Sequence, residues 1–255
     1  MDSWIKDVIQ RLQACTDLVE FKAILVDMRK QLGFEHFLYG VRLSNAFTSI
    51  DHFVVSDYPD VWLHEYMSNN YAAFDPVVLH CTSHHEPYCW DRMYESTDPK
   101  VIAFADACAS HGLAGGVCIG IHGYSGENGI FCVGGPQPLA TGSDEAFAVI
   151  MPLNTLLPFI HAAITRLTSF KEAEDSKPRL TEREQECLLW SAEGKTTEET
   201  ALILSISAPT VAFHLKNAIQ KLNVSNRNQA IAKAALLGII TPQYSTLSAP
   251  RTYLF

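Results

Sequence analysis

The chain has 255 residues, of which 47% are hydrophobic and 18% are charged, a composition typical of a folded globular protein rather than a disordered one. This length allows one large domain or two modest ones. The net charge of −9 is unevenly distributed, because residues 1–175 contain 10 Lys/Arg and 22 Asp/Glu, a net −12, whereas residues 176–240 contain 8 and 6, a net +2. This asymmetry indicates that any contact with nucleic acid belongs to the second segment.

Neither of two membrane-directing patterns is found in the sequence. No run of about 18 consecutive apolar residues occurs, so no transmembrane helix is expected. The opening residues, MDSWIKDVIQRL, carry acidic side chains in an amphipathic pattern, unlike a secretory signal peptide. The sequence therefore predicts a cytoplasmic protein with no membrane partner.

The cysteines lie mostly among apolar neighbours and include no C-x-x-C pair. We expect them to be buried free thiols in a reducing cytosol rather than disulfides. There are seven: Cys15, Cys81, Cys89, Cys108, Cys118, Cys132 and Cys187.

Hydrophobic periodicity divides residues 1–171 into helical and extended stretches. We predict a first helix over 3–32, single or broken near 15–17 and ended by Gly33, and then strands over 37–41 and 49–55 with a turn at Ser44 and Asn45. A helix over 60–70, a chain break at Asp75 and Pro76, and a helix over 99–111 follow. The last elements are strands over 116–122 and 129–133, joined by a turn over 124–128, and a helix over 144–171. Pro152 and Pro158 predict kinks or a late start in the last helix. These elements predict an α+β fold, an α-β-α sandwich with an antiparallel sheet.

Composition changes twice after this domain. Residues 172–179 are polar, charged and contain proline, which predicts a linker between domain 1–171 and a second domain over 180–240. Residues 241–255 form a C-terminal extension with several aromatic and aliphatic residues. A docked segment and a frayed end are both compatible with that extension.

Residues 180–240 carry the start and stop signals of four short helices. Capping boxes of the S/T-x-x-E type begin the first two helices, and a serine followed by an early proline begins the third. The first helix begins with Thr181 and Glu184 and stops at Gly194, and the second begins with Thr196 and Glu199. The third begins with Ser207 and Pro209, and the fourth is capped by Ser225 and ended by Gly238.

The third of these helices has two unlike faces. Val211, Leu215, Ala218 and Leu222 share one face and are predicted to pack on the other helices. Phe213, Lys216, Asn217 and Gln220 occupy the opposite face, with Ala212 and Thr210 at its edges. A polar, cationic helix that follows another across a tight turn is typical of a helix-turn-helix in the DNA major groove. Periodicity alone is equally compatible with a small helical bundle that has a solvated face.

The same segment resembles the DNA-binding domain of LuxR-type regulators. The matching residues are Leu180-Thr181-x-Arg183-Glu184, Gly194-Lys195, Glu199-x-Ala201-x-x-Leu204, Thr210-Val211-x-x-His214-x-x-Asn217 and Lys221-Leu222. The resemblance implies a four-helix domain whose third helix reads double-stranded DNA and whose fourth helps the chain form a homodimer. The residues that it assigns to DNA are Thr210, Phe213, His214, Lys216, Asn217 and Gln220. Ala212 stands where some members have a basic base-reading residue, so direct readout is expected to rest on Lys216 and its neighbours.

Aromatic residues and one acid are concentrated between residues 58 and 91. They are Tyr58, Trp62, Tyr66, Tyr71, Asp75 and Trp90. Tyr58, Trp62 and Tyr66 follow helical spacing and share a face if the helix extends that far back. Aromatic walls with a few fixed polar groups are typical of a small-ligand pocket. The alternative is an aromatic core in which Asp75 caps a turn beside Pro76.

This spacing is similar to the autoinducer-binding domain of the same family, which binds N-acyl-homoserine lactones. The resemblance implies that Trp62 donates to the lactone carbonyl, Asp75 accepts from the ligand amide and Tyr58 donates to an acyl carbonyl. The remaining residues that it implies to surround the ligand are Tyr66, Tyr71, Trp90, Phe104 and Cys108. Two residues depart from the family pattern: Cys108, which affects chain specificity, and Gly120, which replaces a proline and is expected to loosen a strand.

Other functions have weaker support. His80, Cys81, His84 and His85 match no zinc motif, and no G-x-S-x-G pattern occurs, so we expect no metal, no cofactor and no enzyme. A lactone-degrading enzyme and a phosphorylation-controlled response regulator are minor alternatives. The main alternative is the same architecture sensing a different small molecule, or acting without one.

The expected protein is a transcription factor that binds DNA and an autoinducer, with RNA polymerase as a further possible partner.

Burying a carboxylate such as Asp75 among aromatic rings is unfavourable unless it accepts hydrogen bonds. A ligand that binds only the folded state also stabilises that state. We therefore hypothesise that the ligand-free domain is marginally stable and that ligand promotes the dimer that binds DNA.

Overall fold

The computed structural model describes residues 3–46, 49–123, 128–168 and 178–241. The chain forms two compact units that divide between Ser176 and Lys177, and each is described by itself. Of the predicted linker, residues 172–177 lie outside the described residues, as do 242–255 of the predicted extension and 124–127 of the predicted turn.

The N-terminal unit is built on one five-stranded sheet of order β2-β1-β5-β4-β3. Strand β1 pairs antiparallel with β5, β5 with β4, and β4 with β3, which confirms the predicted antiparallel sheet. The turn predicted at Ser44 and Asn45 is wrong, because both residues belong to β1. The strands are β1 (His36–Ala46), β2 (Ser49–Ser56), β3 (Tyr88–Cys89), β4 (Gly115–His122) and β5 (Asn128–Gly135).

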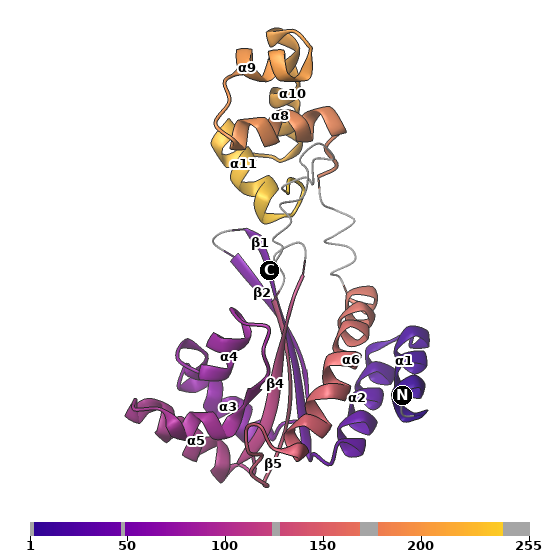
Figure 1. The fold of residues 1–255 in the computed structure, drawn as a ribbon, viewed down its shortest axis with the longest axis vertical. Helices are drawn as coiled ribbons and strands as arrows, with labels where there is room; N and C mark the ends of the chain where they lie inside the picture. The colour runs from indigo at the N-terminus through magenta and orange to yellow at the C-terminus, as the bar shows by residue number, and fades with distance from the viewer. Residues whose placement is uncertain (1–2, 47–48, 124–127, 169–177, 242–255) are drawn as a thin grey trace, which may run out of the picture. The chain divides into compact units, whose positions relative to one another are not determined.

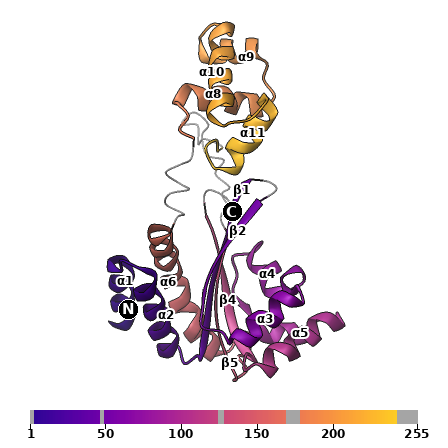
Figure 2. The same ribbon diagram turned by 180° about the vertical axis from the view of Figure 1, so that it is seen from behind.

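Helices cover both faces of this sheet, as predicted (Figure 1 and, from behind, Figure 2). One face carries α1 (Ser3–Ala14), α2 (Leu18–Gln31) and α6 (Asp144–Leu167); the other carries α3 (Asp60–Ser68), α4 (Pro76–Cys81) and α5 (Pro99–Ser110), with short 3₁₀ turns η1 (Tyr71–Ala73) and η2 (Trp90–Glu95). The N-terminal helix is in two pieces because Asp17 caps α2, accepting from the amides of Val19 and Glu20 at 2.9 and 2.8 Å. The sequence pattern did not predict α4, whose first residue is Pro76 and which follows the expected break directly.

Each face of the sheet has its own apolar core. Under α1, α2 and α6 the fully buried side chains include Phe21, Phe37, Tyr39, Phe131 and Ile160. Under α3, α4 and α5 a second cluster contains Trp62, Tyr88, Trp90, Phe104 and Leu113. The first core is conventional packing of amphipathic helices on a sheet, whereas the second surrounds a cavity.

Helix α6 runs as one helix from Asp144, so the late start predicted from Pro152 and Pro158 is wrong. Ser143 caps it by accepting from the amide of Ala146 at 3.0 Å. Among the described helices taken singly, α6 is long and apolar enough to cross a membrane by length and composition. Its apolar face packs in the core of the unit, where Leu153, Leu156 and Ile160 are buried.

Strand β4 passes through Gly120 without interruption, with Gly120 paired to Ile130 of β5, and the expected loosening of the strand stays a prediction. A Cβ at Gly120 would collide with the backbone carbonyl of Cys81, the last residue of α4. The missing side chain therefore lets α4 approach the sheet.

Cys118 and Cys132 form a disulfide, which corrects the prediction that all seven cysteines are free thiols. The two residues are directly opposite on β4 and β5, with Cα atoms 4.1 Å apart. Because the pairing register is not visible in the sequence, no spacing rule could have indicated the bond. The other five, Cys15, Cys81, Cys89, Cys108 and Cys187, are buried free thiols as predicted.

The C-terminal unit consists of the four predicted helices, α8 (Glu182–Ala192), α9 (Thr197–Leu204), α10 (Ala208–Lys221) and α11 (Arg227–Leu236). Both predicted capping boxes and the Ser207 cap are present. The predicted fourth cap is wrong, since Asn226 and not Ser225 accepts from the amide of Gln229, at 2.9 Å. The buried face of α10 is as predicted, with Val211, Leu215 and Ala218 in the core.

Candidate functional site

A cavity of about 380 Å³ lies within the second core of the N-terminal unit. This volume falls in the range of pockets that hold small organic ligands. Seven of the eight residues predicted to surround a ligand line it: Tyr58, Trp62, Tyr66, Asp75, Trp90, Phe104 and Cys108. The eighth, Tyr71, does not.

Tyr71 instead supports the aromatic wall. Its ring stacks on Trp62 with centroids 5.7 Å apart and packs edge-on against Phe104 at 5.1 Å. Its hydroxyl donates to Glu65 at 3.3 Å, and the other carboxylate oxygen of Glu65 lies 2.8 Å from Nε2 of His111. Trp62 is therefore held from one side by Tyr71, which limits the movement of a cavity-lining indole.

Asp75 lines the cavity with an acidic side chain that is 6% exposed. Its Oδ1 accepts from the amide of Val77 and its Oδ2 from the hydroxyl of Tyr66, each at 2.8 Å. Burial raises the pKa of Asp75, while the bonds from Tyr66 and Val77 oppose that rise. The side chain thus caps α4, as one of the two interpretations predicted, and also presents a carboxylate to the cavity.

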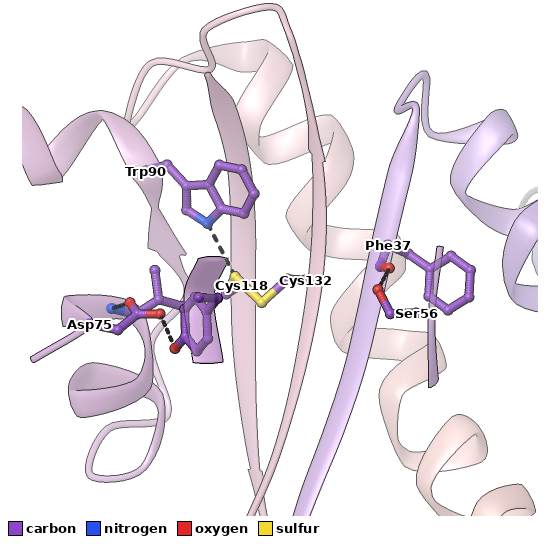
Figure 3. The surroundings of a disulfide bond; sticks show 8 residues. Phe37, Ser56, Asp75, Trp90, Cys118 and Cys132 are labelled. Atoms are coloured by element: carbon purple, nitrogen blue, oxygen red, sulfur yellow. Dashed lines mark hydrogen bonds between the residues drawn. A yellow bond between two sulfur atoms is a disulfide. The ribbon is translucent and has the colours of Figure 1, made fainter. Parts of the chain in front are cut away.

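The sheet supplies the opposite wall (Figure 3). Trp90 lies over Gly134, where any Cβ would collide with its indole, and its Nε1 is 3.2 Å from Sγ of Cys118. The Cys118–Cys132 disulfide therefore forms part of the cavity wall, and Cys108 faces the cavity from α5. Burial raises the pKa of the Cys108 thiol, which keeps it neutral and apolar in character.

Sequence reasoning missed the strand residues of this wall. Val41 of β1, Val54 of β2 and Cys118 of β4 belong to this wall. The others alternate along β1 and β5 and are Leu38, Gly40 and Arg42, and Asn128, Ile130 and Cys132. Alternation along a strand could have grouped each set of three on one face. Only the register brings the two sets together, since Leu38 pairs with Cys132 and Arg42 with Asn128.

In the C-terminal unit, α9 and α10 meet at 106°, an angle typical of a helix-turn-helix. Ser205 adopts the left-handed conformation at φ 54°, which turns the chain between the two helices. Ser207 then begins α10, and its hydroxyl is 2.7 Å from that of Thr210. The second helix of the motif is therefore begun by side-chain caps rather than by packing alone.

All six residues predicted to contact DNA lie on α10 outside its fully buried face. Phe213, Lys216 and Gln220 are exposed, and Thr210, His214 and Asn217 are partly exposed. Phe213 is 60% exposed, an unusual position for a phenylalanine that has no role in packing. Its ring lies 5.8 Å from that of His214.

Within the described ranges, no three His, Cys, Asp or Glu residues gather in a way that could hold a metal ion. His80 and His84 stack on each other at 4.5 Å, and Nε2 of His80 lies 2.9 Å from the carbonyl oxygen of Glu86. The histidine-rich segment therefore makes local contacts at the end of α4.

Comparison with known proteins connects both sites to one family. The model described as "Autoinducer binding domain" matches residues 17–164, and that described as "Bacterial regulatory proteins, luxR family" matches residues 178–234. The transcriptional activator VanR of Vibrio anguillarum is 32% identical over 241 residues, 92% of this chain and 97% of VanR. The activator LuxR of Aliivibrio fischeri is 31% identical over 243 residues, 93% of this chain and 94% of LuxR.

Among solved structures, Escherichia coli SdiA is similar with a TM-score of 0.71 and 26% identity, covering 94% of this chain and 99% of SdiA. The matches span both units, so the ligand-binding and DNA-binding halves occur together in the relatives. The N-terminal unit has a cavity with one buried acid, and the C-terminal unit has a helix-turn-helix with an exposed second helix. This combination is typical of a regulator and not of an enzyme. The chain belongs to the LuxR family of quorum-sensing transcriptional regulators, with an autoinducer-binding domain followed by a helix-turn-helix DNA-binding domain.

Proposed function

We propose that the autoinducer of this regulator is an N-acyl-homoserine lactone bound in the cavity of the N-terminal unit. The observation that carries the proposal is the buried carboxylate of Asp75 facing an otherwise largely apolar, aromatic-walled cavity. Each carboxylate oxygen has two acceptor positions and uses one, for Tyr66 or Val77, so Asp75 retains capacity for a ligand amide N–H. Trp62 and Tyr58 then serve as donors to the lactone and acyl carbonyls, and Cys108 limits the space beside the chain.

Thermal unfolding of the purified protein against a panel of acyl-homoserine lactones tests this proposal, with Asp75→Ala beside the wild type. We expect a rise in melting temperature that depends on chain length and is lost in Asp75→Ala. If no lactone shifts a wild-type protein that mass spectrometry shows to be free of ligand, the lactone is not the autoinducer.

A second ligand class has one specific observation in its favour. One structure of SdiA, which is 27% identical to this chain and similar to it with a TM-score of 0.66, is a complex with octanoyl-rac-glycerol, an acylglycerol. An acylglycerol has no amide N–H for Asp75 but can donate through its hydroxyls. Octanoyl-glycerol therefore belongs in the same panel, and a larger shift with it than with any lactone would favour this class. Release of ring-opened lactone by the purified protein would instead revive the enzymatic alternative.

On the DNA side, we infer that the chain binds as a cytoplasmic homodimer, with residues 207–222 of each copy in the major groove. Half-sites would then be separated by whole turns of about 34 Å. Thr210, His214, Asn217 and Gln220 are the polar candidates for contact with bases and phosphates, and Phe213 is placed for apolar contact with a thymine methyl. Contact with RNA polymerase is a further part of this proposal.

Lys216→Ala tests the assignment of α10, since Lys216 is exposed on it and makes no ion pair within the described part of the chain. We expect weaker binding to the specific site, a salt dependence reduced by about one phosphate contact, and unchanged ligand binding. Lys22→Ala, exposed on α2 of the N-terminal unit and equal in charge change, is the matched control. Equal DNA affinity for wild type and Lys216→Ala would remove this residue from the interface.

A further inference from the structure

Beyond the residues that face the lactone, the sheet carries a polar row at the far end of the cavity. Arg42 of β1 pairs with Asn128 of β5, which in turn pairs with His122 of β4. Three neighbouring strands therefore place one polar residue each in the same row. Arg42 and Asn128 line the cavity, and His122 lies on the cavity face two residues beyond Gly120 and four beyond Cys118.

Two members of this row carry buried polar atoms without a hydrogen-bond partner in the part of the chain that the structure describes. Nε of Arg42 and both ring nitrogens of His122 are buried and have no hydrogen-bond partner there. The only ring contact found for His122 is edge-on with His85, at 4.6 Å. A buried donor without an acceptor is unfavourable, and a guanidinium group is best satisfied by an anionic oxygen. Among the described residues that line the cavity, Asp75 is the one with an acidic side chain.

The distance along the sheet suits a ligand with two polar ends. The row at Cys118 and Cys132, where Trp90 contacts the disulfide, is four residues from the row at His122 and Asn128. Four residues of antiparallel strand span about 13 Å. The wall between the two rows is formed by Gly40 and Ile130, so a mainly apolar chain fits between them.

We propose that Arg42, Asn128 and His122 form a subsite for the far end of the acyl chain, and that this end carries a hydrogen-bond-accepting oxygen, in the first place a carboxylate. Arg42 supplies the charge, and Asn128 and His122 supply further hydrogen-bonding groups beside it. The inference rests on the proposed function, because it concerns the same ligand. It narrows the autoinducer to acyl-homoserine lactones whose chain ends in a polar group rather than in a methyl group.

The test compares two lactones of equal chain length, one ending in a methyl group and one in a carboxylate, by calorimetric dissociation constants with the full-length protein. We expect wild type to bind the carboxylate-ended lactone at least about tenfold more tightly, as one charge-assisted hydrogen bond allows. Arg42→Met keeps an unbranched, flexible side chain but removes the charge and the N–H donors, and should abolish this preference. Asn128→Leu, which changes no charge, should reduce it.

Arg11→Met is the matched control, because Arg11 pairs with Asp27 on the opposite side of the unit and should leave the preference intact. If wild type binds the methyl-ended lactone equally well or more tightly, this inference is overturned but the proposed function is not. A preference for the carboxylate-ended lactone that survives in both Arg42→Met and Asn128→Leu would have the same consequence. Failure of both lactones to bind ligand-free wild type would overturn the proposed function, and this inference with it.

Discussion

At Asp75, burial and hydrogen bonding act in opposite directions on one carboxyl group. Burial raises its pKa above the ordinary 3.8, so the folded state holds the proton more tightly than the unfolded chain does. The carboxylate therefore weakens the ligand-free fold as pH rises from 3.8 through the folded-state pKa, and this loss persists at neutral pH. A ligand amide that donates to Asp75 would recover part of it.

Asp75→Asn is expected to separate stability from ligand binding. The neutral amide keeps an oxygen for the Val77 amide and offers N–H groups to the Tyr66 hydroxyl, so the ligand-free variant should be as stable as wild type or up to about 1 kcal/mol more stable at pH 7. At about pH 3 this advantage should vanish, because the wild-type group is then protonated in both states. In Asp75→Asn, the rise in melting temperature that the lactone causes should be largely lost. A variant that is less stable at pH 7 but still responds to ligand would contradict this account.

In the C-terminal unit, Glu184 has its pKa shifted in the opposite direction, downward. It is 3% exposed; burial alone would raise its pKa, but Nζ of Lys221 and the amide of Thr181, each at 2.8 Å, hold the pKa below the usual 4.5. Its stabilising contribution is present above pH 4.5 and is lost as pH falls through the lower folded-state value.

Glu184→Gln should therefore destabilise the C-terminal unit at pH 7 by about 1–3 kcal/mol, since it removes a buried charge partner of Lys221. The difference from wild type should shrink on acidification below pH 4.5. Glu186→Gln, which loses only the half-exposed pair with Arg183, is the matched control and should change little. Urea unfolding followed by circular dichroism at several pH values measures both variants, and a pH-independent difference would contradict the assignment.

At the scale of elements, close backbone approach decides where α4 sits. The carbonyl of Cys81 occupies the space that a Cβ of Gly120 would need. Helix α4, which Asp75 caps, carries Val77 and Val78 into the cavity wall, so the position of the helix also sets the shape of the cavity.

Gly120→Ala should destabilise the N-terminal unit by about 1–3 kcal/mol, as overpacking in a core generally does. Gly135→Ala on β5 is the control, because its Cβ would have no neighbour closer than 3.6 Å. The first variant should also weaken ligand binding, while the second should leave it unchanged. Denaturant midpoints and a ligand titration measure these effects, and equal midpoints for the two variants would contradict the packing argument.

At the scale of the whole molecule, ligand binding and assembly are expected to be coupled through stability. The second core of the N-terminal unit encloses the cavity, so an occupant completes the packing of Trp62, Phe104 and Trp90. Anything that binds only the folded state raises its stability by mass action. Ligand should therefore raise the melting temperature and, by ordering the unit, the fraction of dimer.

Sedimentation and thermal unfolding of protein refolded with and without lactone measure this coupling. We expect at least about 2.7 kcal/mol of added stability when free ligand is a hundred times its dissociation constant. Ligand-free protein that refolds to the same melting temperature and dimer fraction would show that folding does not depend on ligand.

Local patterns in the sequence were sufficient for the C-terminal unit. The capping boxes at Thr181 and Thr196, the Ser207 cap and the apolar stripe of α10 are short-range features, because helices bond within a few residues of themselves. The cap of the fourth helix was predicted one residue too early, at Ser225, because the neighbouring Asn226 makes the cap. The aromatic cluster and Asp75 were also identifiable, since they lie close together in the chain.

Only the tertiary structure decided the strand wall of the cavity. The opposition of Cys118 and Cys132, the row of Arg42, Asn128 and His122, and the approach of Cys81 to Gly120 all depend on strand register and helix placement. Likewise, Tyr71 is near Trp62 in sequence, yet packing places it behind the indole and outside the cavity. The sequence by itself determined the longer helices, the caps at Thr181, Thr196 and Ser207, and the aromatic and acidic residues between 58 and 91 that line the cavity. Which of those residues meet was decided by long-range pairing, because hydrogen bonds between strands join residues whose separation no local pattern records.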